Sequence, residues 1–218
     1  MSEDPLSLAA QLYLLAWDAD KRELTGTDCP DCLVRAGALT ELVQRGLLVD
    51  AEGAAKPVDD ALAGDVALDG LLELIGESRP RSWQTWVGHR SKITLDAVRT
   101  QLVDSGHLRA VTSRRLGLFP STSYELQQPQ LVEELRKEAR YLLLGTEPAD
   151  DISDRAAALV ALAAAGELRT FASGRERGQY RTRIDELTER SGATAPELKK
   201  VIGEVRTAMT VAITAEES

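Results

Sequence analysis

Residues 32–46 read CLVRAGALTELVQRG, and the apolar side chains in this stretch recur every three or four positions. Cys32, Ala36, Leu39 and Val43 would therefore lie on one face of an α-helix. Gly46 closes the stretch, and glycine commonly ends a helix because it adopts the left-handed conformation at little cost. The pattern predicts an amphipathic helix with a defined end.

Helical patterns continue along the chain on both sides of this stretch. Alanine and leucine are abundant and aromatic residues make up only 4% of the 218 residues, which favours helices over sheets. Asp65 precedes an apolar run and predicts a helix N-cap. Gly106 predicts the end of a helix over residues 92–105. Trp83 and Trp86 share one face of a short helix, so we expect them to pack in the core. Further helices are expected over residues 6–18, 130–144, 152–165, 175–190 and 196–213.

The last of these helices carries a broad apolar stripe. Leu198, Val201, Ile202 and Val205 lie on it, which predicts a deeply buried helix. We therefore expect an all-α globular bundle of about eight helices around a buried C-terminal helix, with one protruding β-hairpin. All of residues 1–218 would form a single domain.

The expected hairpin lies between residues 108 and 119. Leu108–Val111 and Leu116–Phe119 read as strands on either side of a break at residues 112–115. A second short strand is expected at Leu47–Val49, closed by a polar turn over residues 50–53. The tip of the 108–119 hairpin would combine cations with apolar side chains, namely Arg114, Arg115, Leu116, Leu118 and Phe119.

The charge of the chain reverses locally in the same region. The protein has a net charge of −9, yet residues 79–115 carry eight basic side chains against Asp96 and Asp104. An acidic protein repels anions overall, so any anion that it binds has to meet a local basic patch. Cations beside an apolar hairpin tip suggest a surface that docks on an anionic membrane. The eight basic residues are Arg79, Arg81, Arg90, Lys92, Arg99, Arg109, Arg114 and Arg115.

The two cysteines of the chain form a C-x-x-C motif, Cys29-Pro30-Asp31-Cys32. Such a motif at a helix start makes a redox pair conceivable. The helical surroundings lack the βαβ pattern of redox folds, and Asp31 would oppose a thiolate, so we expect neither redox chemistry nor a disulfide framework. Zinc needs about four ligands, and only His89 and His107 could join the cysteines, without finger spacing. No metal and no cofactor are predicted.

The sequence contains no motif typical of catalysis and no segment typical of membrane insertion. No nucleophile elbow, zinc-protease, phosphate-loop or dinucleotide motif is present, so we expect no enzyme. Met1–Ala10 contains Glu3 and Asp4 and lacks a basic leader, and no apolar run approaches the length of a membrane span. These features predict a cytoplasmic protein that associates reversibly with the cytoplasmic face of a membrane.

Several segments, in chain order, resemble the Golgi phosphoprotein 3 family. They are residues 35–46 (RAGALTELVQRG), residues 64–69 (GDVALD), residues 102–108 (LVDSGHL) and Asp154-Arg155 before an alanine-rich helix. The resemblance spans nearly the whole chain. It implies a helical domain with an apolar hairpin and a shallow basic pocket for phosphatidylinositol 4-phosphate. Eukaryotic relatives resemble trafficking adaptors that read the cytosolic tails of membrane proteins.

The resemblance also implies which residues would bind the head group. Arg35 matches the family's phosphate-contacting arginine, and Lys92 and Leu95 match two further arginines, with Arg90 and Arg99 nearby. Gly26 stands where the family has a tryptophan. The basic N-terminal arm of eukaryotic members is replaced by Ser2-Glu3-Asp4. A homo-oligomer through the hairpin would follow the family.

Other interpretations of the same residues remain open. The helix over residues 92–105 and the hairpin over 107–119 could be the recognition helix and wing of a winged-helix DNA-binding regulator. The basic stretch could simply be a solvated surface, with Arg35 and Arg45 paired to Glu41 or Asp31. The chain could also act as an adaptor for cytosolic peptide tails without binding lipid.

Overall fold

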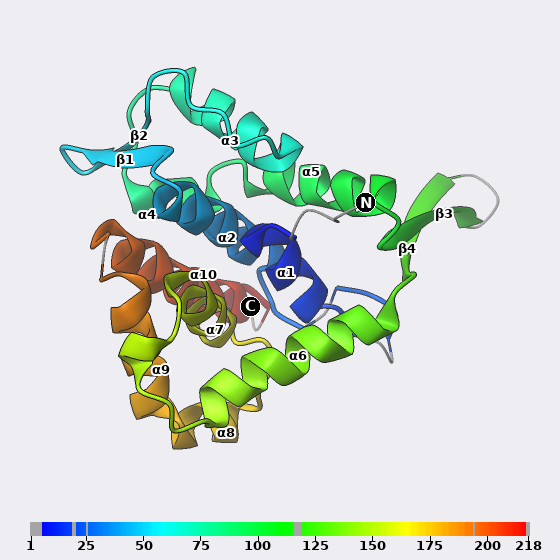
Figure 1. The fold of residues 1–218 in the computed structure, drawn as a ribbon. Helices are drawn as coiled ribbons and strands as arrows, with labels where there is room; N and C mark the ends of the chain where they lie inside the picture. Colours follow the sequence, from blue (N-terminus) through cyan, green and yellow to red (C-terminus); the bar gives the residue numbers. More distant parts are fainter. Residues whose placement is uncertain (1–5, 19–20, 25, 116–118, 194, 217–218) are drawn as a thin grey trace.

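The structure is a computed structural model that describes residues 6–18, 21–24, 26–115, 119–193 and 195–216. Within these residues the chain forms ten α-helices, a short 3-10 helix and two antiparallel β-hairpins (Figure 1). More helices are present than expected, partly because the segment predicted over 175–190 divides into two at Tyr180. The elements are α1 (Leu8–Leu15), α2 (Pro30–Gln44), β1 (Leu48–Ala51), β2 (Ala54–Pro57), α3 (Val66–Gly76), α4 (Trp83–Gly88), α5 (Ser91–Asp104), β3 (Leu108–Arg115), β4 (Phe119–Leu126), α6 (Pro129–Leu144), η1 (Ala149–Asp151), α7 (Asp154–Ala165), α8 (Gly174–Gln179), α9 (Arg181–Ser191) and α10 (Glu197–Glu216).

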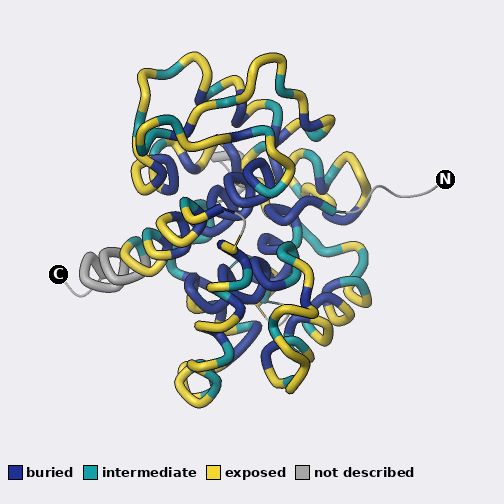
Figure 2. The backbone as a smooth tube through the Cα atoms, turned by 60° about the vertical axis from the view of Figure 1, so that its left-hand side comes forward, coloured by how far each residue is buried: buried dark blue, intermediate teal, exposed yellow. Residues whose placement is uncertain are grey.

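Helices α2 and α7 form the centre of the bundle. Every residue from Cys32 to Val43 in α2 and from Ala157 to Ala165 in α7 is buried. Helix α2 contacts α1, α3, α4, α5, α7 and α10. Figure 2 shows this buried interior, with exposed residues on the outer turns. The apolar composition of both helices is thus explained by contacts on all sides.

The expectation of a central C-terminal helix is therefore corrected. Helix α10 buries Leu198, Val201, Ile202 and Val205, but Lys199 and Lys200 on its other face are exposed. A helix with one polar face packs against the core from outside instead of occupying its middle. No side chain beyond residue 208 belongs to the described part. Among the described helices, none combines the length and the hydropathy that a bilayer span requires.

All three predicted helix-boundary residues are found in the structure. The Asp65 side chain accepts a hydrogen bond from the Leu68 backbone amide and caps α3. Gly46 and Gly106 follow α2 and α5 with positive φ angles of 69° and 74°. Trp83 and Trp86 are completely buried, as expected from their shared helix face.

The hairpins differ from the prediction in number and in register. Strands β3 and β4 are eight residues each and pair from Leu108 with Leu126 to Arg115 with Phe119, so the expected break at residues 112–115 is part of β3. Thr112 and Ser113 continue the strand because they pair with Thr122 and Ser121, and a β-branched residue fits a pleated surface. Figure 1 shows this hairpin projecting from the side of the bundle. Of the second hairpin, β1–β2, the sequence predicted only the first strand and the turn.

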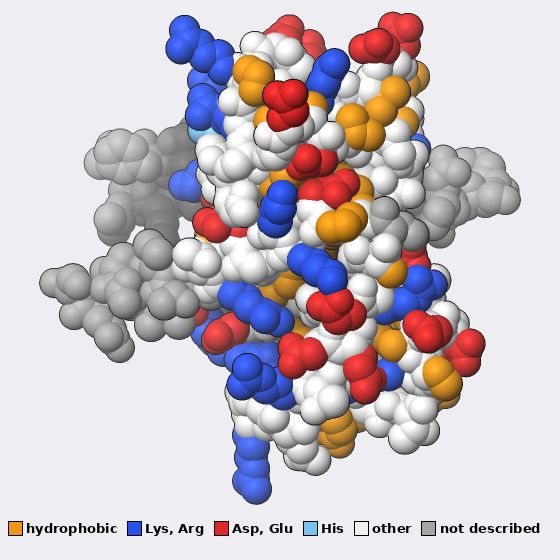
Figure 3. Space-filling model, turned by 90° about the vertical axis from the view of Figure 1, so that its left-hand side faces the viewer, with side chains coloured by type: hydrophobic (Ala, Val, Ile, Leu, Met, Phe, Trp, Pro, Cys, Tyr) orange, Lys and Arg blue, Asp and Glu red, His pale blue; other side chains and the backbone are white. Residues whose placement is uncertain are grey.

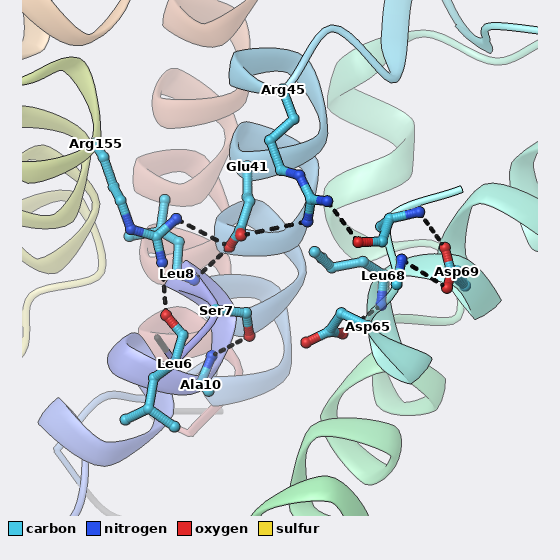
Figure 4. Close-up of polar contacts among 12 residues, drawn as sticks. Leu6, Ser7, Leu8, Ala10, Glu41, Arg45, Asp65, Leu68, Asp69 and Arg155 are labelled. Carbon is cyan, nitrogen blue, oxygen red and sulfur yellow. Dashed lines mark hydrogen bonds and ion pairs between the residues drawn. The ribbon is translucent and has the colours of Figure 1, made fainter. Parts of the chain in front are cut away.

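A buried carboxylate on α2 connects three other parts of the fold. The Leu8 backbone amide donates to Glu41 Oε2 at 2.5 Å, and Arg155 Nη1 lies 3.2 Å from the same oxygen. Arg45 Nη1 lies 3.8 Å from Glu41 Oε1, and Arg45 Nη2 donates to the Ala63 carbonyl. Figure 4 shows the resulting chain of contacts from α1 and α7 across α2 to the turn before α3. One side chain therefore fixes the relative positions of several elements.

Glycine 37 allows α1 and α2 to approach closely. A Cβ atom at this position would lie 2.7 Å from Leu12 Cδ1 and 3.1 Å from the Ala9 Cα atom. Gly70, in the middle of α3, has no neighbour within 4 Å of such a Cβ. The two glycines therefore differ in what a methyl group would meet.

The first prediction compares these two glycines. Gly70→Ala is expected to raise the free energy of unfolding by about 1 kcal/mol, because alanine is the better helix former. Gly37→Ala is expected to lower it by about 1–3 kcal/mol, because the methyl group overpacks the α1–α2 contact. Urea unfolding followed by circular dichroism measures both values. Equal changes of the same sign would contradict the close packing at Gly37.

The second prediction concerns Glu41. Glu41→Ala is expected to lower the free energy of unfolding by about 3 kcal/mol, because it leaves Arg155 and the Leu8 amide without their buried acceptor. Glu134→Ala on the exposed side of α6 is the control and should change stability by less than about 0.5 kcal/mol. Similar effects of the two substitutions in urea unfolding would argue against a structural role for Glu41.

Candidate functional site

The basic stretch of the sequence is distributed over three places in the fold. Arg81, Arg90 and Lys92 flank α4 and begin α5, Arg99 lies farther along α5, and Arg109 lies on β3. Lys92 and Arg99 are two helical turns apart, about 10 Å along the axis. We call Arg81, His89, Arg90 and Lys92 the α4–α5 cation cluster.

The turn between α4 and α5 is built on Arg35. Arg35 Nε donates to Thr94 Oγ1 at 2.8 Å, and Nη1 donates to the carbonyls of Trp86 and His89 at 3.2 and 3.0 Å. Nη2 donates to the Arg90 carbonyl at 2.9 Å. The Arg35 side chain is completely buried, and burial lowers the pKa of its guanidinium to about 10. Its donors are thus directed at the protein backbone, and the side chain supports the turn that carries the cluster.

Cations converge around His89. Burial lowers the pKa of His89, and the nearby charges of Arg81, Arg90 and Arg35 lower it further. A positive charge on the imidazole is disfavoured when other cations are close. The arginines named here come from α2, from the segment before α4 and from the residue before α5.

The outer members of the cluster face solvent. Arg90 and Lys92 are exposed, and neither forms a salt bridge with another residue of the described chain. Arg90 is the residue before α5, has a left-handed backbone with φ of 53°, and makes no side-chain cap. The first amides of α5 therefore add a partial positive charge beside the two side chains. Arg81 Nε is buried and has no hydrogen-bond partner among the described residues.

One carboxylate accompanies the cluster. Asp31 Oδ2 accepts a hydrogen bond from Ser91 Oγ at 2.6 Å, at the start of α5. Arg81, Arg90 and Lys92 together carry more positive charge than Asp31 balances. An anion with several oxygens is the ligand that such a group attracts.

Arg99 belongs to a different environment, beneath the β3–β4 hairpin. Its Nε donates to Tyr13 Oη at 3.3 Å, and its guanidinium lies 5.8 and 5.3 Å from the ring centroids of Tyr13 and Tyr124. Burial raises the pKa of Tyr13, while Arg99 opposes that shift. Arg99 also pairs with Asp96 at 3.3 Å. It lines a cavity of about 610 Å³ that also contains Lys21, Arg22, Glu23 and Trp17. The structure thus separates Arg99 from the cluster.

The structure describes only part of the predicted membrane-contacting segment. Leu116 and Leu118 fall outside the described residues. The backbones of Arg114, Arg115 and Phe119 belong to the strand ends. Arg109, nearer the base, pairs with Glu125 across the strands. The hairpin itself is confirmed, while the contacts of its tip remain a prediction.

Two departures from the family pattern have a packing explanation. Gly26 is buried, and a Cβ atom there would lie 2.7 Å from the Ala16 carbonyl oxygen and 2.8 Å from Thr170 Oγ1. A tryptophan at this position would require the loop to move. Leu95 is only 6% exposed and belongs to the core. These positions therefore contribute packing where the family has pocket residues.

The cysteine motif is closed by a bond that was not predicted from the sequence. Cys29 and Cys32 form a disulfide at the start of α2. Ligand atoms of Cys29, Asp31 and Cys32 lie within 4.8 Å of one another, and this group includes neither histidine. His107 is buried, and its Nδ1 lies 2.7 Å from Ser105 Oγ. In this state the two sulfur atoms are covalently bonded to each other.

The roles of Arg81 and His89 were missed from the sequence. The available signal was their position in the basic stretch, where both flank the Trp83–Trp86 helix. Figure 3 shows acidic and basic side chains interspersed on one face of the molecule, without a continuous basic surface. For the attraction of an anion, the cations that meet at one turn are therefore more important than the summed charge of residues 79–115.

The third prediction tests the role of Arg35. Arg35→Lys is expected to lower the free energy of unfolding by about 3 kcal/mol, because an ammonium cannot reproduce the planar fork that satisfies three carbonyls and Thr94. Amide exchange over residues 86–95 should accelerate together with this loss. Arg175→Lys, at an exposed position of α8, is the control. A variant at Arg35 as stable as that control would show that the buried fork does not hold the turn.

Comparison with known proteins places the chain in a family. A search of curated protein sequences gives no match. The family model of Golgi phosphoprotein 3 (GPP34) matches residues 8–205, which is most of the chain. The matched region includes α2, the α4–α5 turn and the hairpin described above. The chain therefore belongs to the Golgi phosphoprotein 3 family.

Proposed function

We propose that this protein binds membranes peripherally by recognising the phosphorylated head group of an anionic phosphoinositide. The proposal rests on one observation: Arg90 and Lys92 are exposed at the start of α5, on a turn whose backbone the buried Arg35 holds, and neither has a salt bridge within the described residues. Phosphatidylinositol 4-phosphate is the head group that the family resemblance suggests. Its phosphate oxygens match the donors of Arg90 and Lys92 and the first amides of α5.

The hairpin would supply the second contact with the membrane. Its tip sequence, residues 114–119, combines two arginines with leucine and phenylalanine. Each basic side chain near an anionic leaflet contributes about 1 kcal/mol, and buried apolar side chains add to this. Two or three cations with an apolar tip give reversible docking, as expected of a peripheral protein.

In this proposal the protein acts by recruitment and carries out no reaction. The family resemblance suggests cytosolic tails of membrane proteins as further partners and the hairpin as a site of self-association. Arg35 has a positioning role, because its hydrogen bonds set the backbone on which Arg90 and Lys92 stand.

The DNA-binding alternative gains no support from the arrangement of α5. This helix packs on α2 and α3, and its exposed residues include Asp96 and Asp104. Arg99, on the same helix, pairs with Asp96 and lies against two tyrosines. Carboxylates on the presented face would repel phosphates of a duplex. The experiment below therefore includes DNA binding as a result that would contradict the membrane proposal.

The fourth prediction uses vesicle co-sedimentation. The protein should pellet with phosphatidylcholine vesicles that carry phosphatidylinositol 4-phosphate, less with phosphatidylserine vesicles of equal charge density, and least with phosphatidylcholine alone. Arg90→Gln/Lys92→Gln should weaken binding roughly thirtyfold, since two cations contribute about 2 kcal/mol. Leu118→Asp should also weaken it, and added salt should reduce binding throughout.

A matched control keeps the change in net charge constant. Lys137→Gln/Arg175→Gln removes two exposed cations from α6 and α8 and should leave vesicle binding within about twofold of the parent chain. Urea unfolding confirms that each variant is folded. Equal pelleting with all three vesicle types, or DNA binding at the same salt with no vesicle binding, would overturn the proposal.

A further inference from the structure

The disulfide at the start of α2 takes no part in the proposed membrane contact. Cys29 is the residue immediately before the helix, Pro30 is its first residue, and Cys32 lies within the first turn. Chain geometry brings the two sulfurs together, and the pair is covalently closed. This is a dithiol–disulfide couple located on the most deeply packed helix.

The two sulfurs differ in accessibility. Cys29 is half-buried, whereas Cys32 is 6% exposed. A thiol from solvent therefore reaches Cys29 first, and Cys32 is the leaving sulfur. Cys32 lies among the free amides of the first helical turn, which stabilise a departing thiolate.

Asp31 connects the disulfide to the α4–α5 turn. Its Oδ1 lies 3.4 Å from Cys29 Sγ, and its Oδ2 accepts the hydrogen bond from Ser91 Oγ. Ser91 is the first residue of α5 and stands between Arg90 and Lys92. The Asp31 charge also stabilises the charged form of Arg35, the side chain that holds the same turn. The loop closed by the disulfide is thus hydrogen-bonded to the side chain of Ser91, the residue between the two exposed cations.

We propose that Cys29–Cys32 is a thiol–disulfide exchange site for a small thiol or a protein dithiol, and that its reduction releases Asp31 from Ser91 and loosens the start of α5. A thiolate attacks Cys29 Sγ, a mixed disulfide forms, and Cys32 leaves as a thiolate that takes a proton. A second thiol then attacks the sulfur of the bound thiol, and Cys29 leaves in turn. The protein gains two electrons and two protons, and the two thiols become one disulfide.

Reduction changes both the geometry and the charge around Asp31. The covalent closure of residues 29–32 is lost, so their backbone is no longer constrained to the present turn. In the fraction of the reduced protein in which a cysteine is ionised, its thiolate repels the carboxylate, whereas the disulfide is always neutral. Both effects act against the hydrogen bond between Asp31 and Ser91. Electron exchange at the pair is independent of lipid binding, while any effect on membrane affinity rests on the proposed function.

The fifth prediction is tested with the full chain in buffers of reduced and oxidised glutathione containing a metal chelator. Alkylation and intact mass should show a reversible two-electron transition between the disulfide and two free thiols. Amide exchange over residues 91–95 should accelerate about three- to tenfold on reduction, as expected from the loss of one hydrogen bond. Amides of α9, far from the pair, should be unchanged.

Variants separate the redox couple from its connection to α5. Ser91→Ala should give the faster exchange in both redox states, and Asp31→Ala should do the same. Ser105→Ala, at the other end of α5, should preserve the full response to reduction. Cys29→Ser/Cys32→Ser should resemble the reduced protein, and the Ser91 and Asp31 variants decide the question if this double variant does not fold.

The possible outcomes are distinct. Thiols that never close, or a disulfide that glutathione never reduces, would overturn the exchange site. A two-electron transition without any change over residues 91–95 would overturn the connection to α5. Absence of vesicle binding in both redox states would contradict the proposed function and leave the exchange result unaffected.

Discussion

Two buried charged side chains of α2 connect this helix to its neighbours. One of them donates hydrogen bonds and the other accepts them. Arg35 donates to the α4–α5 turn, and Glu41 accepts from α1 and faces arginines of α2 and α7. A buried charge is tolerated only when its partners are complete, so each side chain fixes the geometry of the elements that surround it. The placement of α2 at the centre follows from these requirements together with its apolar faces. The turn that presents Arg90 and Lys92 is a consequence of this arrangement.

The family motifs have a structural explanation. Residues 35–46 contain Arg35, Glu41 and Arg45, residues 64–69 contain the Asp65 cap, and Asp154-Arg155 supplies the second partner of Glu41. Asp69 accepts from the Ala63 and Gly64 amides, so it shapes the turn that receives Arg45. Three of the four motifs meet in one polar network although they are far apart in the chain (Figure 4). The residues of these motifs make contacts that hold the fold. The motifs therefore indicate the family, and they say less about a ligand.

The position of an arginine in the sequence says little about its availability. Arg35, Arg99 and Arg90 were all expected to bind the head group, yet Arg35 is enclosed by carbonyls, Arg99 lies against two tyrosines and Arg90 is exposed. The difference arises from the neighbours supplied by other elements. The same is true of Cys29 and Cys32, whose surroundings connect them through Asp31 to α5. The proposed binding site and the proposed exchange site therefore lie at the beginnings of two helices, α5 and α2, that contact each other.

Sequence alone determined the helical class, the ends of α2 and α5, the Asp65 cap, the burial of Trp83 and Trp86, and the family, because periodicity and boundary residues act locally. It did not determine which helix is central, since α2, α7 and α10 are all apolar and only their packing distinguishes them. The break at Tyr180, the extended β3–β4 register and the second hairpin were decided by pairing and packing across the fold. The cation cluster likewise depends on tertiary structure, because Arg35 closes a turn more than fifty residues away and so selects which positive charges remain exposed.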